Sequence, residues 1–148
     1  QHTKKGKEMA KMHIHVSVDN LEKSIKFYNS LFGSKPSKQK KDYAKWELED
    51  PKINLAISER GTKPGVDHLG LQAETEEEMA IIRKRIKSSN LETFNEGETT
   101  CCYAVSDKSW LQDPSGLPWE TYHTMEDASF FNESPNEETG VCCAPEIK

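Results

Sequence analysis

The sequence carries one pattern of elements twice, and this internal repeat constrains the fold more than any other feature. Aligning His13 with His68, an offset of 68 − 13 = 55 residues, also aligns Asn20 with Thr75. Asn and Thr both favour the N-terminal cap of a helix. Asp-Pro turns at 50–51 and 113–114 follow at corresponding places in the two copies. Each copy therefore predicts a strand, a helix and three further strands, in the order βαβββ.

Hydrophobic periodicity supports that order. Residues 12–18 alternate as a half-buried strand does, and strands are also predicted at 43–49, 53–58, 66–73, 108–112 and 118–124. A helix is predicted between the Asn20 cap and Gly33, and a second from the Thr75 cap to about Ile86. The apolar stripe of the first helix consists of Leu21, Ile25, Tyr28, Leu31 and Phe32.

We therefore expect an α+β fold, with two βαβββ modules in tandem over residues 12–60 and 66–124 and a linker at 61–65. The sheets of the two modules should face each other around a half-open cavity, with the helices outside. Residues 1–11 are interpreted as a loose tail or an expression remnant. Residues 125–148 are interpreted as a flexible acidic tail that carries Cys142 and Cys143.

Three side chains of the two modules predict a metal site. His13 and His68 occupy equivalent places on the face of the first strand that looks into the cavity, so a pseudo-twofold axis would bring them together. Glu120 alternates with its neighbours Trp119 and Thr121 in the last strand, so its side chain can point toward the two histidines. The corresponding position of the first module, Asn54 or Leu55, offers no carboxylate. Two imidazoles and one carboxylate are the composition of an open facial triad, which suits Fe(II) that must bind O₂ and substrate together.

Other interpretations of these histidines remain open. His15 has the same parity as His13, so it is a rival first ligand or simply lines the cavity. A single histidine on a strand is more often a satisfied core residue than a ligand. Two histidines at the same repeat position, with a carboxylate in the closing strand, favour a metal.

The adjacent pair Cys101-Cys102 is a second candidate site. Neighbouring Cα atoms lie about 3.8 Å apart, less than the roughly 4.4–6.8 Å that disulfides usually span. Two such thiols can instead converge on one soft, thiophilic atom if the backbone is irregular, and Gly97 can supply that irregularity. Buried free cysteine is also common as a small hydrophobe.

Composition excludes several classes of function. The 148 residues carry a formal net charge of −5, which argues against nucleic acid as a partner. No apolar run approaches the roughly 20 residues that a membrane-spanning helix needs. The polar, lysine-rich first ten residues do not resemble a secretory signal, so we expect a cytoplasmic protein with reduced cysteines.

The motifs resemble those of the vicinal oxygen chelate superfamily, which includes glyoxalase I, bleomycin resistance proteins and extradiol dioxygenases. The resemblance covers residues 12–124: the segment 13–28 looks like the opening strand and helix, Asp67-His68-Leu69-Gly70 like the start of the second module, and Pro118-Trp119-Glu120 like the closing ligand. The segment 99–104, followed by Asp107-Lys108 and Trp110, is similar to the organoarsenical carbon–arsenic lyase and cadmium-induced branch.

The resemblance implies a non-haem Fe(II) lyase that uses O₂ to cleave the carbon–arsenic bond of trivalent organoarsenicals, such as methylarsenite or reduced aromatic arsenicals. His13, His68 and Glu120 would then bind Fe(II), and Cys101 and Cys102 would bind the arsenic and act in catalysis. The protein would be a monomer or a homodimer. A metal or metalloid scavenger is the first rival. A glyoxalase-type isomerase is disfavoured because it usually employs four protein ligands, and an extradiol dioxygenase would share the triad but have no use for paired thiols.

Overall fold

The elements follow the predicted order. The computed structural model describes residues 10–61, 63–101 and 104–127. Its elements are β1 (Lys11–Ser17), α1 (Leu21–Phe32), β2 (Lys38–Lys40), β3 (Tyr43–Glu49), β4 (Lys52–Ser58), β5 (Gly65–Ala73), α2 (Glu76–Ser88), β6 (Phe94–Cys101), β7 (Ala104–Gln112) and β8 (Pro118–Asp127). Strands β1–β4 with α1 form the first module, and β5–β8 with α2 form the second. The expected α+β class with two βαβββ modules is confirmed.

The helix ends are where capping chemistry puts them. The side chain of Asn20 accepts a hydrogen bond from the backbone N–H of Lys23 at 2.9 Å. Gly33 ends α1 with φ of 70°, the left-handed region that glycine enters without steric cost. Thr75 caps α2 by accepting from the N–H of Glu78 at 3.1 Å. Each predicted helix start is therefore confirmed.

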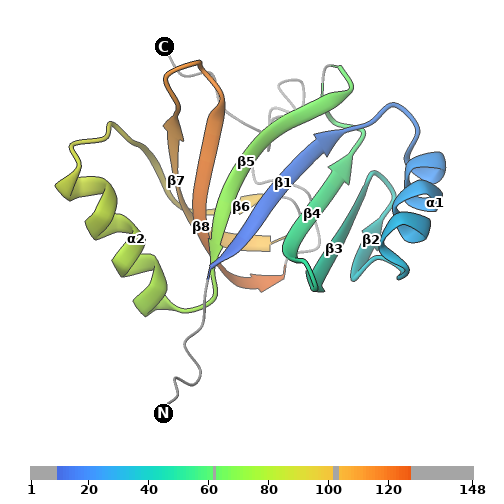
Figure 1. Cartoon of the computed structure of the whole chain (residues 1–148), viewed down its shortest axis with the longest axis horizontal. Coiled ribbons are helices and arrows are strands. Elements are labelled where there is room, and N and C mark those ends of the chain that lie inside the picture. Colours follow the sequence, from blue (N-terminus) through green and yellow to red (C-terminus); the bar gives the residue numbers. More distant parts are fainter. Residues whose placement is uncertain (1–9, 62, 102–103, 128–148) are drawn as a thin grey trace.

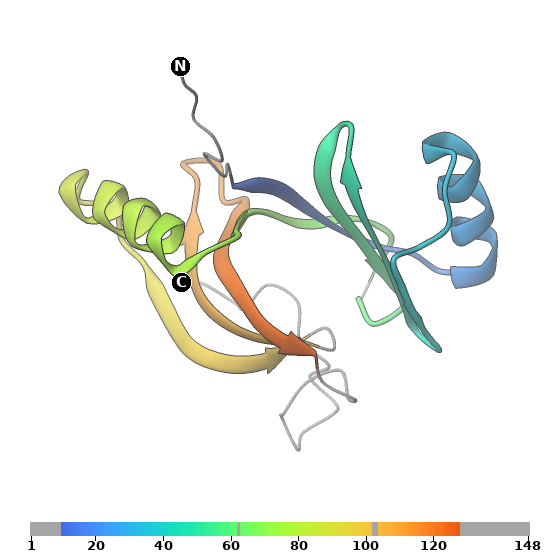
Figure 2. The same ribbon diagram turned by 90° about the horizontal axis from the view of Figure 1, so that it is seen from below.

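The two modules join edge to edge in one sheet. The strand order is β2-β3-β4-β1-β5-β8-β7-β6, and the antiparallel pair β1–β5 forms the seam between modules. The two central strands lie side by side in Figure 1. Figure 2 shows the two halves diverging from this seam, with α1 and α2 on the outer flanks. The two modules therefore share one sheet, because main-chain hydrogen bonds continue across the seam, and the helices lie outside it as expected.

The helices cover the outer face of each half. In the first module α1 packs on a cluster that includes Trp46, Leu55 and Ile57, with Ile14 and Val16 of β1 against it. In the second module a smaller cluster consists of Ala73, Met79, Ile82 and Ile86. One member of the predicted stripe is wrong: Leu31 is 62% exposed, because neighbouring residues of a helix point about 100° apart and it is Phe32 that faces the cluster.

Some element boundaries differ from the expected ones. β5 begins at Gly65, inside the expected linker, and β8 continues to Asp127, past the expected strand end at 124. Backbone pairing with β7, which reaches Ala104↔Asp127, extends β8 into residues whose composition alone predicts no strand. In the described part of the chain, no helix combines the length and the apolar character that crossing a bilayer requires.

Candidate metal centre

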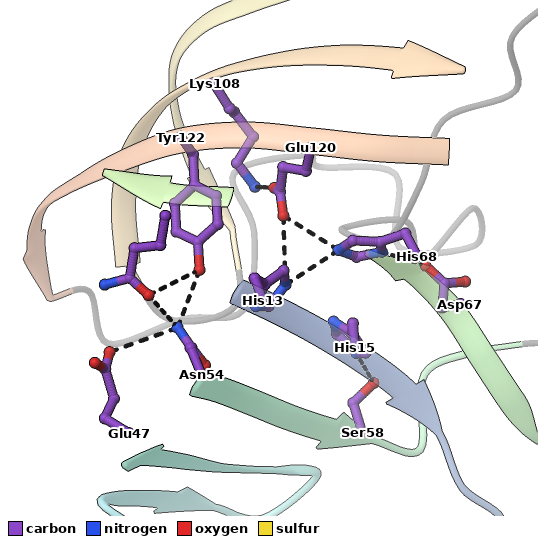
Figure 3. Close-up of polar contacts among 11 residues, drawn as sticks. His13, His15, Glu47, Asn54, Ser58, Asp67, His68, Lys108, Glu120 and Tyr122 are labelled. Carbon is purple, nitrogen blue, oxygen red and sulfur yellow. Dashed lines mark hydrogen bonds and ion pairs between the residues drawn. The ribbon is translucent and has the colours of Figure 1, made fainter. Parts of the chain in front are cut away.

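Three strands direct polar side chains to one place on the inner face of the sheet. β1 contributes His13 and His15, β5 contributes His68 and β8 contributes Glu120 (Figure 3). Alternation puts them there, because Ile14 and Val16 pack against the helix side and leave the histidines on the other. All four are buried, with exposed fractions of 6%, 0%, 1% and 3% respectively.

The predicted ligands converge. His13 Nε2 lies 3.3 Å from His68 Nε2 and 3.4 Å from Glu120 Oε1, and His68 Nε2 lies 3.2 Å from the same oxygen. Donors about 2.1 Å from a shared ion are roughly 3.0–3.4 Å apart, from octahedral to tetrahedral angles. The donor set therefore fits a metal ion on distance and on chemistry. The pseudo-twofold meeting of His13 and His68 was predicted from the sequence.

Asp67 fixes the direction of one imidazole. Its carboxylate oxygen lies 2.6 Å from His68 Nδ1, so this nitrogen donates and the ring is held with Nε2 directed at the site. Metal-binding histidines usually have such a partner on the ring nitrogen that does not bind the metal. His13 Nδ1, by contrast, is buried and has no hydrogen-bond partner within the described structure.

Burial and neighbouring charges shift the pKa values of the three groups at the centre. Burial lowers the pKa of His13 to about 3, so its imidazole is neutral and can donate a lone pair. Burial opposes a charge on His68 too, but hydrogen bonds to Asp67 and Glu120 outweigh it and raise the pKa of His68. Burial alone would raise the pKa of Glu120, yet Lys108 and His68 hold it well below its ordinary value. Glu120 is therefore an anion at neutral pH.

His15 belongs to the same cluster. One ring nitrogen each from His13, His15 and His68 lies within 4.8 Å of the others, an arrangement that can hold a metal ion. The cluster indicates a metal cofactor. His15 Nε2 is engaged with Ser58 Oγ at 2.9 Å, whereas its Nδ1 is buried without a partner in the described structure. The geometry therefore keeps His15 as an alternative to His13 for the first metal ligand, as the sequence predicted.

The first module has no counterpart of Glu120. By the 55-residue offset, Gly70, the register partner of Glu120, corresponds to His15 (70 − 55 = 15), whose partner on β4 is Ala56. The counterpart is therefore Ala56, and the expected Asn54 or Leu55 is wrong by one or two positions. Asn54 Nδ2 instead contacts Gln72 Oε1 at 2.5 Å and Tyr122 OH at 3.0 Å. The fourth symmetric position still offers no ligand.

Lys108 is a part of the site that sequence reasoning missed. Its Nζ lies 2.5 Å from Glu120 Oε2, and both side chains are buried. Strand alternation could have indicated it, because Lys108 lies on the same face of its strand as Trp110, which is fully buried.

The cysteines are placed only in part. Cys101 ends β6, and its backbone pairs with Ala104 where β7 begins. A register shift between Asn95 and Gly97 interrupts β6, in the stretch where irregular backbone was predicted. The thiol of Cys101, all of Cys102, and the pair Cys142-Cys143 lie outside the described part of the structure.

Comparisons with known proteins agree with this architecture. Residues 12–121 match the Glyoxalase/Bleomycin resistance protein/Dioxygenase superfamily. A "Trivalent organoarsenical cleaving enzyme" of Bacillus sp. (strain MD1) is 42% identical, over 90% of this chain and 89% of that protein. The "Cadmium-induced protein CadI" of Mycobacterium bovis is 32% identical, over 94% of this chain and 96% of that one.

A solved structure has the same fold. An extradiol ring-cleaving dioxygenase from B. fuscum superposes with a TM-score of 0.58 at 16% identity, over 81% of this chain and 33% of the dioxygenase chain. The sequence comparisons thus confirm the family that the motifs predicted. This chain belongs to the Glyoxalase/Bleomycin resistance protein/Dioxygenase superfamily.

Proposed function

We propose that this protein is a non-haem Fe(II) lyase that uses O₂ to cleave the carbon–arsenic bond of trivalent organoarsenicals, with inorganic arsenite as the product. The convergence of His13, His68 and Glu120 within 3.2–3.4 Å of one another is the observation that carries this proposal. Relatives at 35–42% identity whose names describe organoarsenical cleavage support the substrate class.

In this proposal His13, His68 and Glu120 hold the iron, and the coordination positions that they leave open accept substrate and O₂. When bound, Fe(II) would supply the O₂ activation that no side chain here provides. Asp67 orients His68 through the 2.6 Å contact to Nδ1, so its other nitrogen remains directed at the site. Burial of all three ligands excludes water from the donors.

Cys101 and Cys102 bind the arsenic. Methylarsenic(III) keeps one carbon and has two exchangeable positions, which two thiolates fill while the carbon–arsenic bond stays free. Holding that bond beside the metal is catalysis by positioning. Because the thiolate is the binding form, capture of the arsenical should strengthen as pH rises toward a thiol pKa of about 8.5.

The test is arsenic speciation after incubation with methylarsenite, with Fe(II) or O₂ withheld in parallel. Inorganic arsenite should form only when both are present. Cys101→Ser and Cys102→Ser should abolish arsenical binding and leave iron bound, whereas His68→Ala should lose iron and still bind the arsenical. A variant of either kind that loses both would refute this division of roles.

A second candidate is a metal- or metalloid-binding resistance protein without turnover. The 32% identity to a cadmium-induced protein favours it, as do four thiols in two adjacent pairs. This candidate predicts stoichiometric binding of Cd(II) or As(III) through cysteine and no release of arsenite from methylarsenite under any condition. The same speciation experiment separates the two.

A further inference from the structure

The two oxygens of Glu120 have different environments. Oε1 faces the histidines, at 3.4 Å from His13 Nε2 and 3.2 Å from His68 Nε2. Oε2 is turned away from them and contacts the Nζ of Lys108 at 2.5 Å, a charge-assisted hydrogen bond. Figure 3 shows Lys108 reaching the carboxylate from the side opposite the histidines. One oxygen is thus presented to the site, and the other is occupied.

The position of the ammonium group follows from the register of β7 and β8. Lys108 is paired with Tyr122, and Trp110 with Glu120, so Lys108 reaches its carboxylate diagonally across the strand pair. Its Nζ lies 6.0 Å from the ring centroid of Trp110 and 5.8 Å from that of Tyr122. These are cation–π distances, so two rings restrict where the ammonium can go.

The same two rings contact the predicted ligands. The Trp110 ring packs edge-on against His68, with centroids 4.9 Å apart, and the Tyr122 ring against His13 at 5.2 Å. Movement of Lys108 is therefore opposed by groups that are themselves packed on the histidines. In the described part of the chain two lysines are buried, Lys108 and Lys11, and the second pairs with Glu47 instead.

We propose that Lys108 is a positioning residue that restricts Glu120 to one metal-facing oxygen. The inference rests on the metal site of the proposed function and adds a role for a residue outside the ligand set. A carboxylate free to use both oxygens would take a second coordination position. With Lys108 on Oε2, that position stays open for an exogenous ligand.

Nitric oxide binding to the Fe(II)-loaded protein tests this, with the electron paramagnetic resonance signal of the nitrosyl complex as readout. Nitric oxide is neutral, so loss of the lysine charge has little direct effect on its affinity. Lys108→Met should keep one equivalent of Fe(II) and bind nitric oxide at least tenfold more weakly than wild type. Lys108→Arg, which keeps a charged donor, should stay within a few-fold of wild type.

Lys11→Met is the matched control, since it also removes a buried, ion-paired lysine, and its nitric oxide affinity should equal that of wild type. Should Lys108→Met fail to fold, Lys108→Gln replaces it in the same titration. Wild-type nitric oxide affinity in the iron-loaded Lys108→Met or Lys108→Gln protein would overturn the inference, as would loss of iron from that protein in its folded state. A wild-type protein that binds no Fe(II) would instead refute the proposed function, and the inference with it.

Discussion

Glu120 can lie beside β5 because the residue opposite it has no side chain. Gly70 is its register partner, and a Cβ atom at this position would collide with the backbone oxygen of Glu120. A backbone atom cannot move out of the way by a rotamer change, so any larger residue at position 70 must displace the β8 backbone at Glu120. The placement of the carboxylate therefore depends on Gly70 as well as on Lys108.

Gly70→Ala should weaken metal binding at least tenfold and lower the free energy of unfolding by about 1–3 kcal/mol, the usual cost of overpacking. Metal titration and urea unfolding measure the two effects. Gly61→Ala is the control, because its Cβ would collide with the Ser17 side chain, away from Glu120. The control should lose stability and keep metal affinity. Unchanged metal affinity in Gly70→Ala would show that β8 adapts without moving its ligand.

The convergence of His13 and His68 could be predicted from the sequence because strand parity and the repeat both indicate it. His13 and His68 needed only the 55-residue offset and the alternation of their strands. Parity places Lys108 on the inward face, but its contact with Glu120, like the role of Gly70, arises from the register between neighbouring strands. The register between strands cannot be inferred from a single sequence. The choice between His13 and His15 as a ligand depends on the same register.

Among the elements, β1 connects the two modules and carries two of the buried histidines. It pairs with β4 in parallel and with β5 antiparallel, so both of its edges are used. Its first residue, Lys11, reaches across β4 to Glu47 of β3, with Nζ 2.9 Å from Oε1. Burial alone would raise the pKa of Glu47, but the hydrogen bond from Lys11 and the charge of Lys45 outweigh it and lower that pKa below its ordinary 4.5.

This pair predicts a pH dependence of stability. A carboxylate whose pKa is lowered in the folded protein stabilises it above its ordinary pKa, and the contribution is lost as pH falls through the folded value. Glu47→Gln should therefore cost about 1 kcal/mol at pH 7, since the partly exposed carboxylate is screened by solvent. In urea unfolding series, the difference from wild type should shrink as pH drops below about 4.5.

Glu49→Gln provides the control for that series. Glu49 lies 3.6 Å from the same ammonium, but its side chain is 78% exposed. The variant should match wild type at every pH. A Glu47→Gln deficit that stays constant from pH 7 to pH 3 would contradict the assignment.

Element positions were more predictable than element ends. Both helix starts have capping residues, and 43–49 was expected and found as a strand because it alternates cleanly. β8 extends past its apolar residues because it pairs with β7. Backbone hydrogen bonding of this kind does not depend on an alternating sequence, so the pattern of residue types did not predict it. Leu31 was placed in the apolar stripe and is nevertheless exposed, since the adjacent Phe32 is the residue that packs against the cluster.

On the scale of the whole molecule, the candidate metal centre spans the seam between the modules. His13 comes from the first module, and His68 and Glu120 come from the second. An ion held by all three would link the two modules and stabilise both, by an amount that grows with metal concentration relative to the dissociation constant. The seam itself was not predictable, because a strand edge such as that of β1 can pair within one chain or with another.

The most direct test is an anaerobic Fe(II) titration of wild type beside His13→Ala, His68→Ala, Glu120→Gln and His15→Ala. Wild type should bind one equivalent, and the first three variants should each lose at least tenfold in affinity. His15→Ala should bind as wild type does, since its Nε2 is engaged with Ser58. Retention of full affinity by Glu120→Gln, with its loss in His15→Ala, would contradict the account and assign the ion to the three histidines.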